Sequence, residues 1–154
     1  MVSKRLVIST VCAVCVSGAV TAQTLEFDSI PSVMPGHPGG VIGESHIFFP
    51  QGGTDIDQLG KMQIKLLGEL LNGETLGTAC IQLIGHSDTG GQRQTNQRIS
   101  LKRAQVVKES LSRVLDSGAR IQNVSAKGES APLPAKSPGS KWQRRVEIRA
   151  ARCS

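Results

Sequence analysis

The feature that most constrains the fold is an alternation of short apolar runs with longer segments of helical periodicity. The runs have the length of strands, and the order along the chain is strand, helix, strand, helix, strand, strand. We expect strands at residues 45–50, 79–85, 120–126 and 144–150, and helices at residues 54–72 and 96–119. A chain with this order buries one face of a sheet against its helices. The sequence therefore predicts a two-layer βαβαββ domain of the α/β (α+β) class.

The first predicted helix has a single apolar face. Thr54 is expected to cap its start, and Asn72 with Gly73 to end it. The apolar side chains that recur at helical spacing are Ile56, Leu59, Met62, Leu66, Leu67 and Leu70. A helix of this kind packs through its apolar face against the rest of the domain.

Residues 1–22 have the pattern of a secretory signal peptide. A basic start leads into an apolar run, and small residues end it at Ala22, where we expect cleavage. The run is shorter than the ~20 residues of a spanning helix, and its retention as an anchor is the alternative. Cys12 and Cys15 each follow a valine, which disfavours the lipid attachment of a lipoprotein signal. The mature chain is expected to be exported and to have no transmembrane segment.

The remaining chain divides into three parts. Residues 23–44 are rich in proline and glycine and lack any period, which is typical of an extended linker. Residues 45–150 are predicted to form the folded domain, and residues 151–154 a short C-terminal tail.

Composition and net charge indicate which classes of binding partner the protein is expected to have. Cleavage takes Lys4 and Arg5 from 18 basic side chains and leaves the 12 acidic ones, so the net charge falls from +6 to +4. Basic residues of the second predicted helix could contact phosphates, but aromatic residues make up only 3% of the chain. Surfaces that stack bases need aromatic side chains. Together with export, this disfavours a nucleic-acid partner.

Two cysteines remain after removal of the signal peptide, Cys80 and Cys153. An even number of cysteines in an exported protein favours a disulfide, because thiols oxidise outside the cytoplasm. The alternative is one buried cysteine and one at a frayed tail.

The second predicted helix carries one arginine on its apolar face. On a helical wheel, an arc contains Ile99, Ala104, Val106, Val107, Leu111, Val114 and Leu115. The charged side chains outside this arc are Arg98, Lys102, Lys108, Glu109 and Arg113. Arg103 alone among the charged residues lies near the middle of the arc, with Asn96 and Ser100 toward the N-terminal end. The apolar face therefore becomes polar beside the turn formed by residues 85–91.

A buried guanidinium keeps its proton and needs an acceptor. Asp88, in the turn before the helix, is the natural candidate. One alternative is a structural ion pair between Asp88 and Arg103. The other is a pocket in which Asp88 binds the ammonium of a ligand and Arg103 binds its carboxylate. A zwitterionic amino-acid head group fits the second alternative.

The segment IGHSDTGGQRQTNQRISLKRAQVV, with GES.P and QRRVEI further along, resembles the OmpA-like C-terminal domain. This peptidoglycan-binding module occurs in outer-membrane porin tails, peptidoglycan-associated lipoproteins and flagellar stator subunits. The family pattern is a Gly-His-Thr-Asp turn, an Asn eight residues past the Asp, then Leu-Ser, Arg-Ala and finally Asn-Arg-Arg-Val. The resemblance extends from about residue 45 to residue 149.

The resemblance implies a ligand and a set of residues that bind it. Asp88 and Arg103 are expected to bind the diaminopimelate of the peptidoglycan stem peptide. Asn96 matches the family Asn beside the same ligand, and Ser87 supplies a hydroxyl where the family has Thr. Arg144 is the first arginine of the terminal pair. No cofactor is implied.

Two further positions are weaker candidates. His86 matches the family His, although a histidine in such a turn is as often a structural hydrogen-bonding group as a ligand contact. In the turn after the first strand, Pro50 and Gly52 stand where the family often has Asp and Asn. Any ligand contact from that turn is then expected from backbone groups or from Gln51.

The chain also departs from the family near its last strand. Gln143 replaces the family Asn, and Ser140 stands where an Arg usually precedes it by three residues. We expect either change to loosen the loop before the last strand.

The family fold has a mixed four-stranded sheet in the order 1-4-2-3, with the last strand antiparallel to its neighbours. This topology places the start of the second strand beside the end of the last. The resemblance thus implies that Cys80 and Cys153 lie close enough to form a disulfide.

The residues do not favour catalysis or a metal site. His37, His46 and His86 are dispersed, and neither an HExxH-like motif nor a cysteine-pair spacing is present. Asp88 could act as a general base, but no second carboxylate stands at a working distance in the sequence. We therefore expect a binding protein with neither a catalytic residue nor a metal.

The predicted function is non-catalytic tethering of an exported protein to diaminopimelate-type peptidoglycan. The expected location is the periplasm or envelope of a Gram-negative bacterium, with outer-membrane association as one form. The alternative is an envelope scaffold or secretion-system accessory of the same fold, which docks another envelope protein through the linker or the basic helix face.

Overall fold

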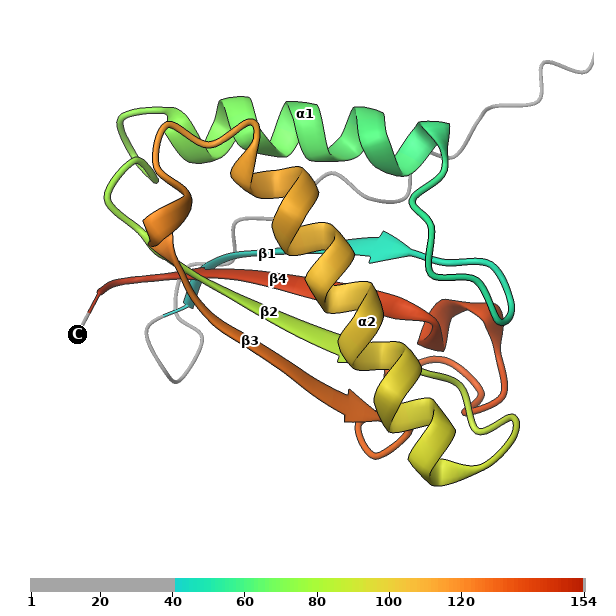
Figure 1. Cartoon of the computed structure of the whole chain (residues 1–154). Coiled ribbons are helices and arrows are strands. Elements are labelled where there is room, and N and C mark those ends of the chain that lie inside the picture. Colours follow the sequence, from blue (N-terminus) through green and yellow to red (C-terminus); the bar gives the residue numbers. More distant parts are fainter. Residues whose placement is uncertain (1–40, 154) are drawn as a thin grey trace, which may run out of the picture.

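The structure is a computed structural model that describes residues 41–153 (Figure 1). The predicted signal peptide and residues 23–40 of the predicted linker lie outside the described residues. The main elements follow the predicted order. They are β1 (Val41–Phe48), α1 (Gln58–Asn72), β2 (Cys80–His86), α2 (Arg93–Ser112), β3 (Ile121–Gly128) and β4 (Arg145–Ala151). Short 3-10 turns at Gly118–Arg120 and Lys141–Gln143 precede β3 and β4.

The strands form one sheet in the order β1-β4-β2-β3, as the resemblance implied. β4 runs antiparallel to β1 and β2, and β2 runs parallel to β3. Both helices cover the same face of this sheet (Figure 1). The strands contribute Ile47, Ile81, Leu83, Val146 and Ile148 to the core, and the helices Ile64, Leu67, Leu71, Ala104, Val107 and Leu111. The prediction of a two-layer α/β domain is confirmed.

β1 begins at Val41 rather than at residue 45, so its first residues belong to the segment that was predicted to be a linker. Val41 pairs with Ala151 of β4, and a register shift follows at Gly43. A glycine weakens the side-chain pattern of a strand, which explains why this part was missed. The backbone pairing with β4, which no local pattern reveals, extends the strand.

α1 differs from its prediction in both its cap and its buried face. Asp57, not Thr54, is the N-cap, and its carboxylate accepts a hydrogen bond of 2.7 Å from the amide of Gly60. The buried residues of the helix are Gly60, Ile64, Leu67, Gly68 and Leu71. The exposed apolar stripe consists of Leu59, Met62, Leu66 and Leu70, with 71%, 53%, 54% and 44% of their surface exposed.

Close packing explains why α1 buries a different face from the predicted one. A Cβ at Gly68 would lie 2.6 Å from a methyl group of Val114, and one at Gly60 would lie 2.7 Å from a methyl group of Ile56. The two glycines therefore let the helix backbone approach its neighbours closely. Because glycine adds nothing to an apolar wheel, the sequence pattern favoured the wrong face.

A disulfide joins Cys80 at the start of β2 to Cys153 after the end of β4, with 5.0 Å between their Cα atoms. Cys80 pairs with Ala151 across the sheet, as the topology implied. The predicted disulfide is confirmed. Among the described residues, no helix has the length and apolar character that a membrane crossing requires.

Candidate functional site

The turn between β2 and α2 places Asp88 at the same end of the sheet as Arg103 of α2. Gly85 lies against α2, and a Cβ at this position would overlap the backbone carbonyl of Ser100. This close approach positions the residues after β2, Ser87 and Asp88, beside the first turns of α2. The buried face of α2 presents its polar end here, as the helical wheel predicted.

Arg103 is buried, with 1% of its surface exposed. Its Nε donates to the carbonyl oxygen of Gly53 at 2.8 Å, and its Nη2 donates to that of Pro50 at 3.2 Å. The guanidinium carbon lies 5.3 Å from the centre of the Phe49 ring, in a cation–π arrangement. Within residues 41–153, Nη1 has no hydrogen-bond acceptor and no ion pair joins Arg103 to a carboxylate.

Burial lowers the pKa of Arg103 to about 10, because desolvation disfavours the charged form. The positive charge of Arg144 adds to this lowering, and the negative charge of Asp88 opposes it. All three charges therefore interact. The pKa still lies well above neutrality, so Arg103 is a cation at pH 7.

Asp88 pairs with Arg144 rather than with Arg103. Nη1 of Arg144 lies 2.7 Å from Oδ2 of Asp88, and both side chains are about 15% exposed. Nε of Arg144 donates to the carbonyl oxygen of Phe49 at 3.3 Å. Oδ1 of Asp88 accepts only a long hydrogen bond of 3.4 Å from the amide of Gly90. Oδ1 therefore has a weaker hydrogen-bond contact than Oδ2, which Arg144 contacts.

Asn96, Glu129 and Ser87 are the other polar residues of the candidate site. Nδ2 of Asn96 donates to the backbone carbonyl of Asp88 at 3.2 Å and to Oε2 of Glu129 at 2.6 Å. Ser87 is 5% exposed, and its hydroxyl has no hydrogen-bond partner in the described part of the chain. A buried hydroxyl without a partner is costly, so its position favours a ligand or ordered water.

The loop before β4 is held by Gln143, which is completely buried. Its Oε1 accepts from the amide of Leu133 at 2.8 Å, and its Nε2 donates to the carbonyls of Lys136 and Ser137, each at 3.2 Å. We expected the replacement of Asn at this position to loosen the loop. The longer amide instead reaches the loop backbone and holds it.

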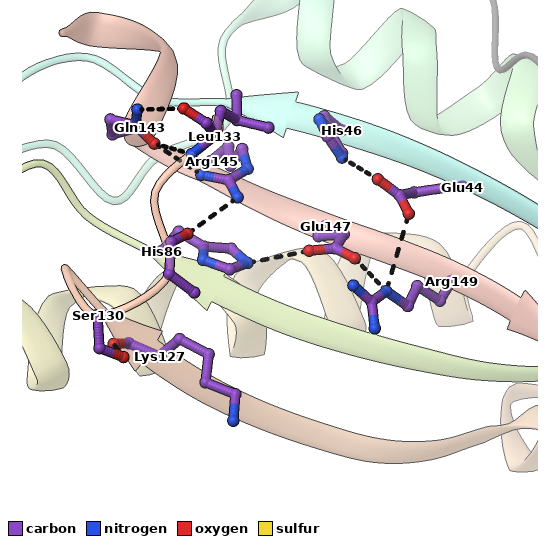
Figure 2. A network of polar contacts seen from close by, with 11 residues as sticks. Glu44, His46, His86, Lys127, Ser130, Leu133, Gln143, Arg145, Glu147 and Arg149 are labelled. Carbon is purple, nitrogen blue, oxygen red and sulfur yellow. Dashed lines mark hydrogen bonds and ion pairs between the residues drawn. The ribbon is translucent and has the colours of Figure 1, made fainter. Parts of the chain in front are cut away.

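The two weaker candidates do not join this set of contacts. His86 extends from the other face of the sheet, where its Nε2 lies 3.1 Å from Oε2 of Glu147 (Figure 2). Gln51 is exposed on the turn after β1. The backbone groups of that turn, at Pro50 and Gly53, serve Arg103 instead.

The sequence interpretation missed two contributors to the site, Phe49 and Glu129. Phe49 contacts Arg103 through its ring and Arg144 through its carbonyl. Glu129 binds Asn96 and lies in the GES.P segment, but nothing in the segment indicated that role. These groups come from separate turns, which only the order of the strands brings together.

The centre of the arrangement is the Asp88 carboxylate with the guanidinium groups of Arg103 and Arg144, and Glu129 lies beside it on Asn96. Arg103 has no acidic partner among residues 41–153. Such a set can bind a ligand that carries a carboxylate and an ammonium group.

Comparison with known proteins identifies the family of the chain. Residues 48–146 match the model of the OmpA family. No curated protein sequence matches the chain.

Several solved structures have the same fold. The OmpA-like domain of FopA1 from Francisella tularensis is 17% identical, with a TM-score of 0.66 and 83% of each chain covered. The peptidoglycan-associated lipoprotein from Burkholderia pseudomallei is 16% identical, with a TM-score of 0.56, over 69% of this chain and 87% of that one. The C-terminal domain of Helicobacter pylori MotB is 16% identical, with a TM-score of 0.60, over 71% and 86%.

Proposed function

The chain belongs to the OmpA family, and from this premise we propose that it binds peptidoglycan without catalysing a reaction. The ligand group is the diaminopimelate of the stem peptide. Similarity in fold to a peptidoglycan-associated lipoprotein supports the proposal. The protein then acts in the periplasm or envelope of a Gram-negative bacterium, where it tethers itself to the cell wall.

The observation that carries the proposal is the charge of Arg103. This buried cation is held by two backbone carbonyls and has no acidic partner in residues 41–153. A structural ion pair with Asp88 would have explained it, but Asp88 pairs with Arg144. A ligand carboxylate that reaches Nη1 of Arg103 would neutralise the positive charge of this side chain. Arginine binds carboxylates in this way through one or two hydrogen bonds.

The second half of the ligand is an ammonium group. Oδ1 of Asp88 is available to it, because Arg144 occupies Oδ2. Diaminopimelate offers both groups at the free end of its side chain. Lysine, which replaces it in other walls, offers an ammonium but no carboxylate there. The charges of Asp88 and Arg103 together therefore select diaminopimelate.

Co-sedimentation with purified cell walls tests this proposal. We expect the protein to sediment with diaminopimelate-type walls and to stay in solution with lysine-type walls. Asp88→Asn and Arg103→Lys are expected to weaken binding by about 10-fold or more. The first removes the negative charge that binds the ammonium group, and the second replaces the planar guanidinium by an ammonium group that cannot make the same contacts. Free diaminopimelate should compete, and free lysine should not.

Matched variants control for charge and for folding. Asp116→Asn and Arg98→Lys make the same substitutions at exposed positions, and their binding should equal that of the unmodified protein. Thermal unfolding of every variant separates loss of the site from loss of the fold. Equal sedimentation of Asp88→Asn, Arg103→Lys and the unmodified protein would refute the proposal.

A second function, docking of another envelope protein, is favoured by the exposed apolar stripe of α1. Four large apolar side chains in a row on one helix are unusual for a surface that contacts only water. Leu66→Gln tests whether the stripe takes part in wall binding. We expect sedimentation with walls to be unchanged, which would show that the stripe takes no part in wall binding.

A further inference from the structure

The face of the sheet opposite the helices carries a compact group of ionisable side chains (Figure 2). Side chains alternate between the two faces of a strand, so the neighbours of core residues Ile47, Val146 and Ile148 point to this face. The group consists of Glu44 and His46 from β1, His86 from β2, and Arg145, Glu147 and Arg149 from β4. Arg145 is 3% exposed, and its hydrogen bonds go to Gln143 and to the carbonyl oxygen of Ala131 rather than to a carboxylate. It lies apart from Arg103, which α2 holds on the other face.

The register of β1 and β4 brings three donors together. His46 pairs directly with Glu147, and Glu44 stands two residues before His46 on the same face. Nε2 of His46 lies 2.9 Å from Oε1 of Glu44. One donor atom from each of the three residues falls within 4.8 Å of the other two. An imidazole and two carboxylates at this spacing are a donor set that zinc binds.

Glu147 is held in place from behind. It is 4% exposed, and Nε2 of His86 contacts its Oε2 at 3.1 Å. His86 is itself 3% exposed, so the pair is fixed inside the protein. Outer contacts of this kind orient a metal ligand and are part of a metal site's affinity. Glu44 and His46, in contrast, are partly exposed and give an ion from solvent access to the group.

A cation already lies between the two carboxylates. Nε of Arg149 contacts Oε1 of Glu147 and lies 3.8 Å from Oε2 of Glu44. The Arg149 side chain is 37% exposed and can turn toward solvent. Its position shows that the two carboxylates together attract positive charge. It also means that a metal ion and Arg149 compete for the same oxygens.

We propose that Glu44, His46 and Glu147 form a binding site for a divalent transition-metal ion of the zinc type. Zinc accepts histidine nitrogen and carboxylate oxygen at about 2.0–2.2 Å, and water completes a site with three protein ligands. The three donor atoms, which lie within 4.8 Å of one another, would have to move closer to bind an ion at these distances, and the partly exposed Glu44 and His46 are the side chains that can do so. The ion would join β1, which among the described strands lies at the edge of the sheet beside β4, more firmly to the sheet.

Calorimetric titration of the purified protein with Zn²⁺ tests the site. The protein is produced without a polyhistidine tag, freed of metal with EDTA and kept oxidised, so that Cys80 and Cys153 stay bonded to each other. We expect one ion per chain, and a visible absorption band of tetrahedral character when Co²⁺ replaces Zn²⁺. Glu44→Gln and His46→Gln should each weaken binding by about 10-fold or more.

Arg149→Gln gives the sharpest result, because it removes the competing cation. A metal site predicts tighter binding in this variant, by about 3-fold or more, since one unit of like charge leaves the site. A surface that binds zinc adventitiously through scattered groups predicts no change. Glu147→Gln is not needed, because loss of this buried carboxylate would also remove the partner of His86.

Glu74→Gln is the matched control. It removes one carboxylate at an exposed position away from the group, and its affinity for Zn²⁺ should equal that of the unmodified protein. The proposal is overturned if Zn²⁺ fails to bind at millimolar concentration, or if binding is unaffected by Glu44→Gln and His46→Gln. An affinity that does not rise in Arg149→Gln overturns it as well.

Discussion

At the scale of single residues, the burial of Arg103 is the central feature. A guanidinium inside a protein must replace the hydrogen bonds that it loses with water. Two carbonyls of the turn after β1 and the ring of Phe49 do this, without an acid among the described residues. The helical wheel predicted the burial of Arg103 correctly. It did not predict its partners, which lie on a distant turn.

Gln143 offers a test of how one side chain holds a loop. Gln143→Ala removes the hydrogen bonds to the backbone of Leu133, Lys136 and Ser137 and leaves a void. We expect the free energy of unfolding, measured with urea, to fall by about 1–3 kcal/mol. Gln105→Ala, at an exposed position of α2, is the control and should have little effect. Equal stability of the two variants would show that the loop does not depend on Gln143.

At the scale of elements, glycines decide how closely helices approach the sheet. Gly60 and Gly68 set the buried face of α1, and Gly85 lets α2 lie against β2. The sequence predicted both helices and all four strands, since side-chain periodicity is a local property. It misplaced the apolar face of α1 and the start of β1, because glycine contributes to packing without contributing to an apolar pattern.

Gly85→Ala tests the approach of α2 to β2. The new methyl group would overlap the carbonyl of Ser100, so helix or strand must move. We expect a loss of about 1–3 kcal/mol in unfolding free energy, together with weaker binding to cell walls, because the site straddles this contact. Circular dichroism melts and co-sedimentation measure the two effects.

Gly43→Ala is the matched control for that substitution. A Cβ at Gly43 would meet only the side chain of Ala150, at an ordinary contact distance of 3.9 Å. We expect a change of no more than about 0.5 kcal/mol. If Gly85→Ala were tolerated as well as Gly43→Ala, the close helix–strand contact would not be a constraint on the site.

At the scale of the whole molecule, the disulfide joins the start of β2 to the chain after the last strand. Cys80 and Cys153 are 73 residues apart in sequence, so the bond restricts a large part of the unfolded chain. We expect reduction to lower the free energy of unfolding by about 2–4 kcal/mol. Urea unfolding with and without dithiothreitol measures the difference.

The double variant Cys80→Ser/Cys153→Ser provides the control. Its stability should match that of the reduced protein and should not respond to dithiothreitol. A reductant that left the unmodified protein equally stable would mean that the bond adds nothing to the fold. β4 is a central strand, so the disulfide holds the residues that follow β4 close to the middle of the sheet.

The element types, the fold class and the burial of Arg103 could be predicted from the sequence, and its resemblance to the OmpA-like domain implied the order of the strands. These follow from periodicity and from short motifs, which are properties of neighbouring residues. The pairing of Asp88 with Arg144 and the approach of Glu44 and His46 to Glu147 could be seen only in the folded structure. Such contacts join segments far apart in the chain, and they depend on strand register and on close backbone packing, neither of which a local pattern encodes.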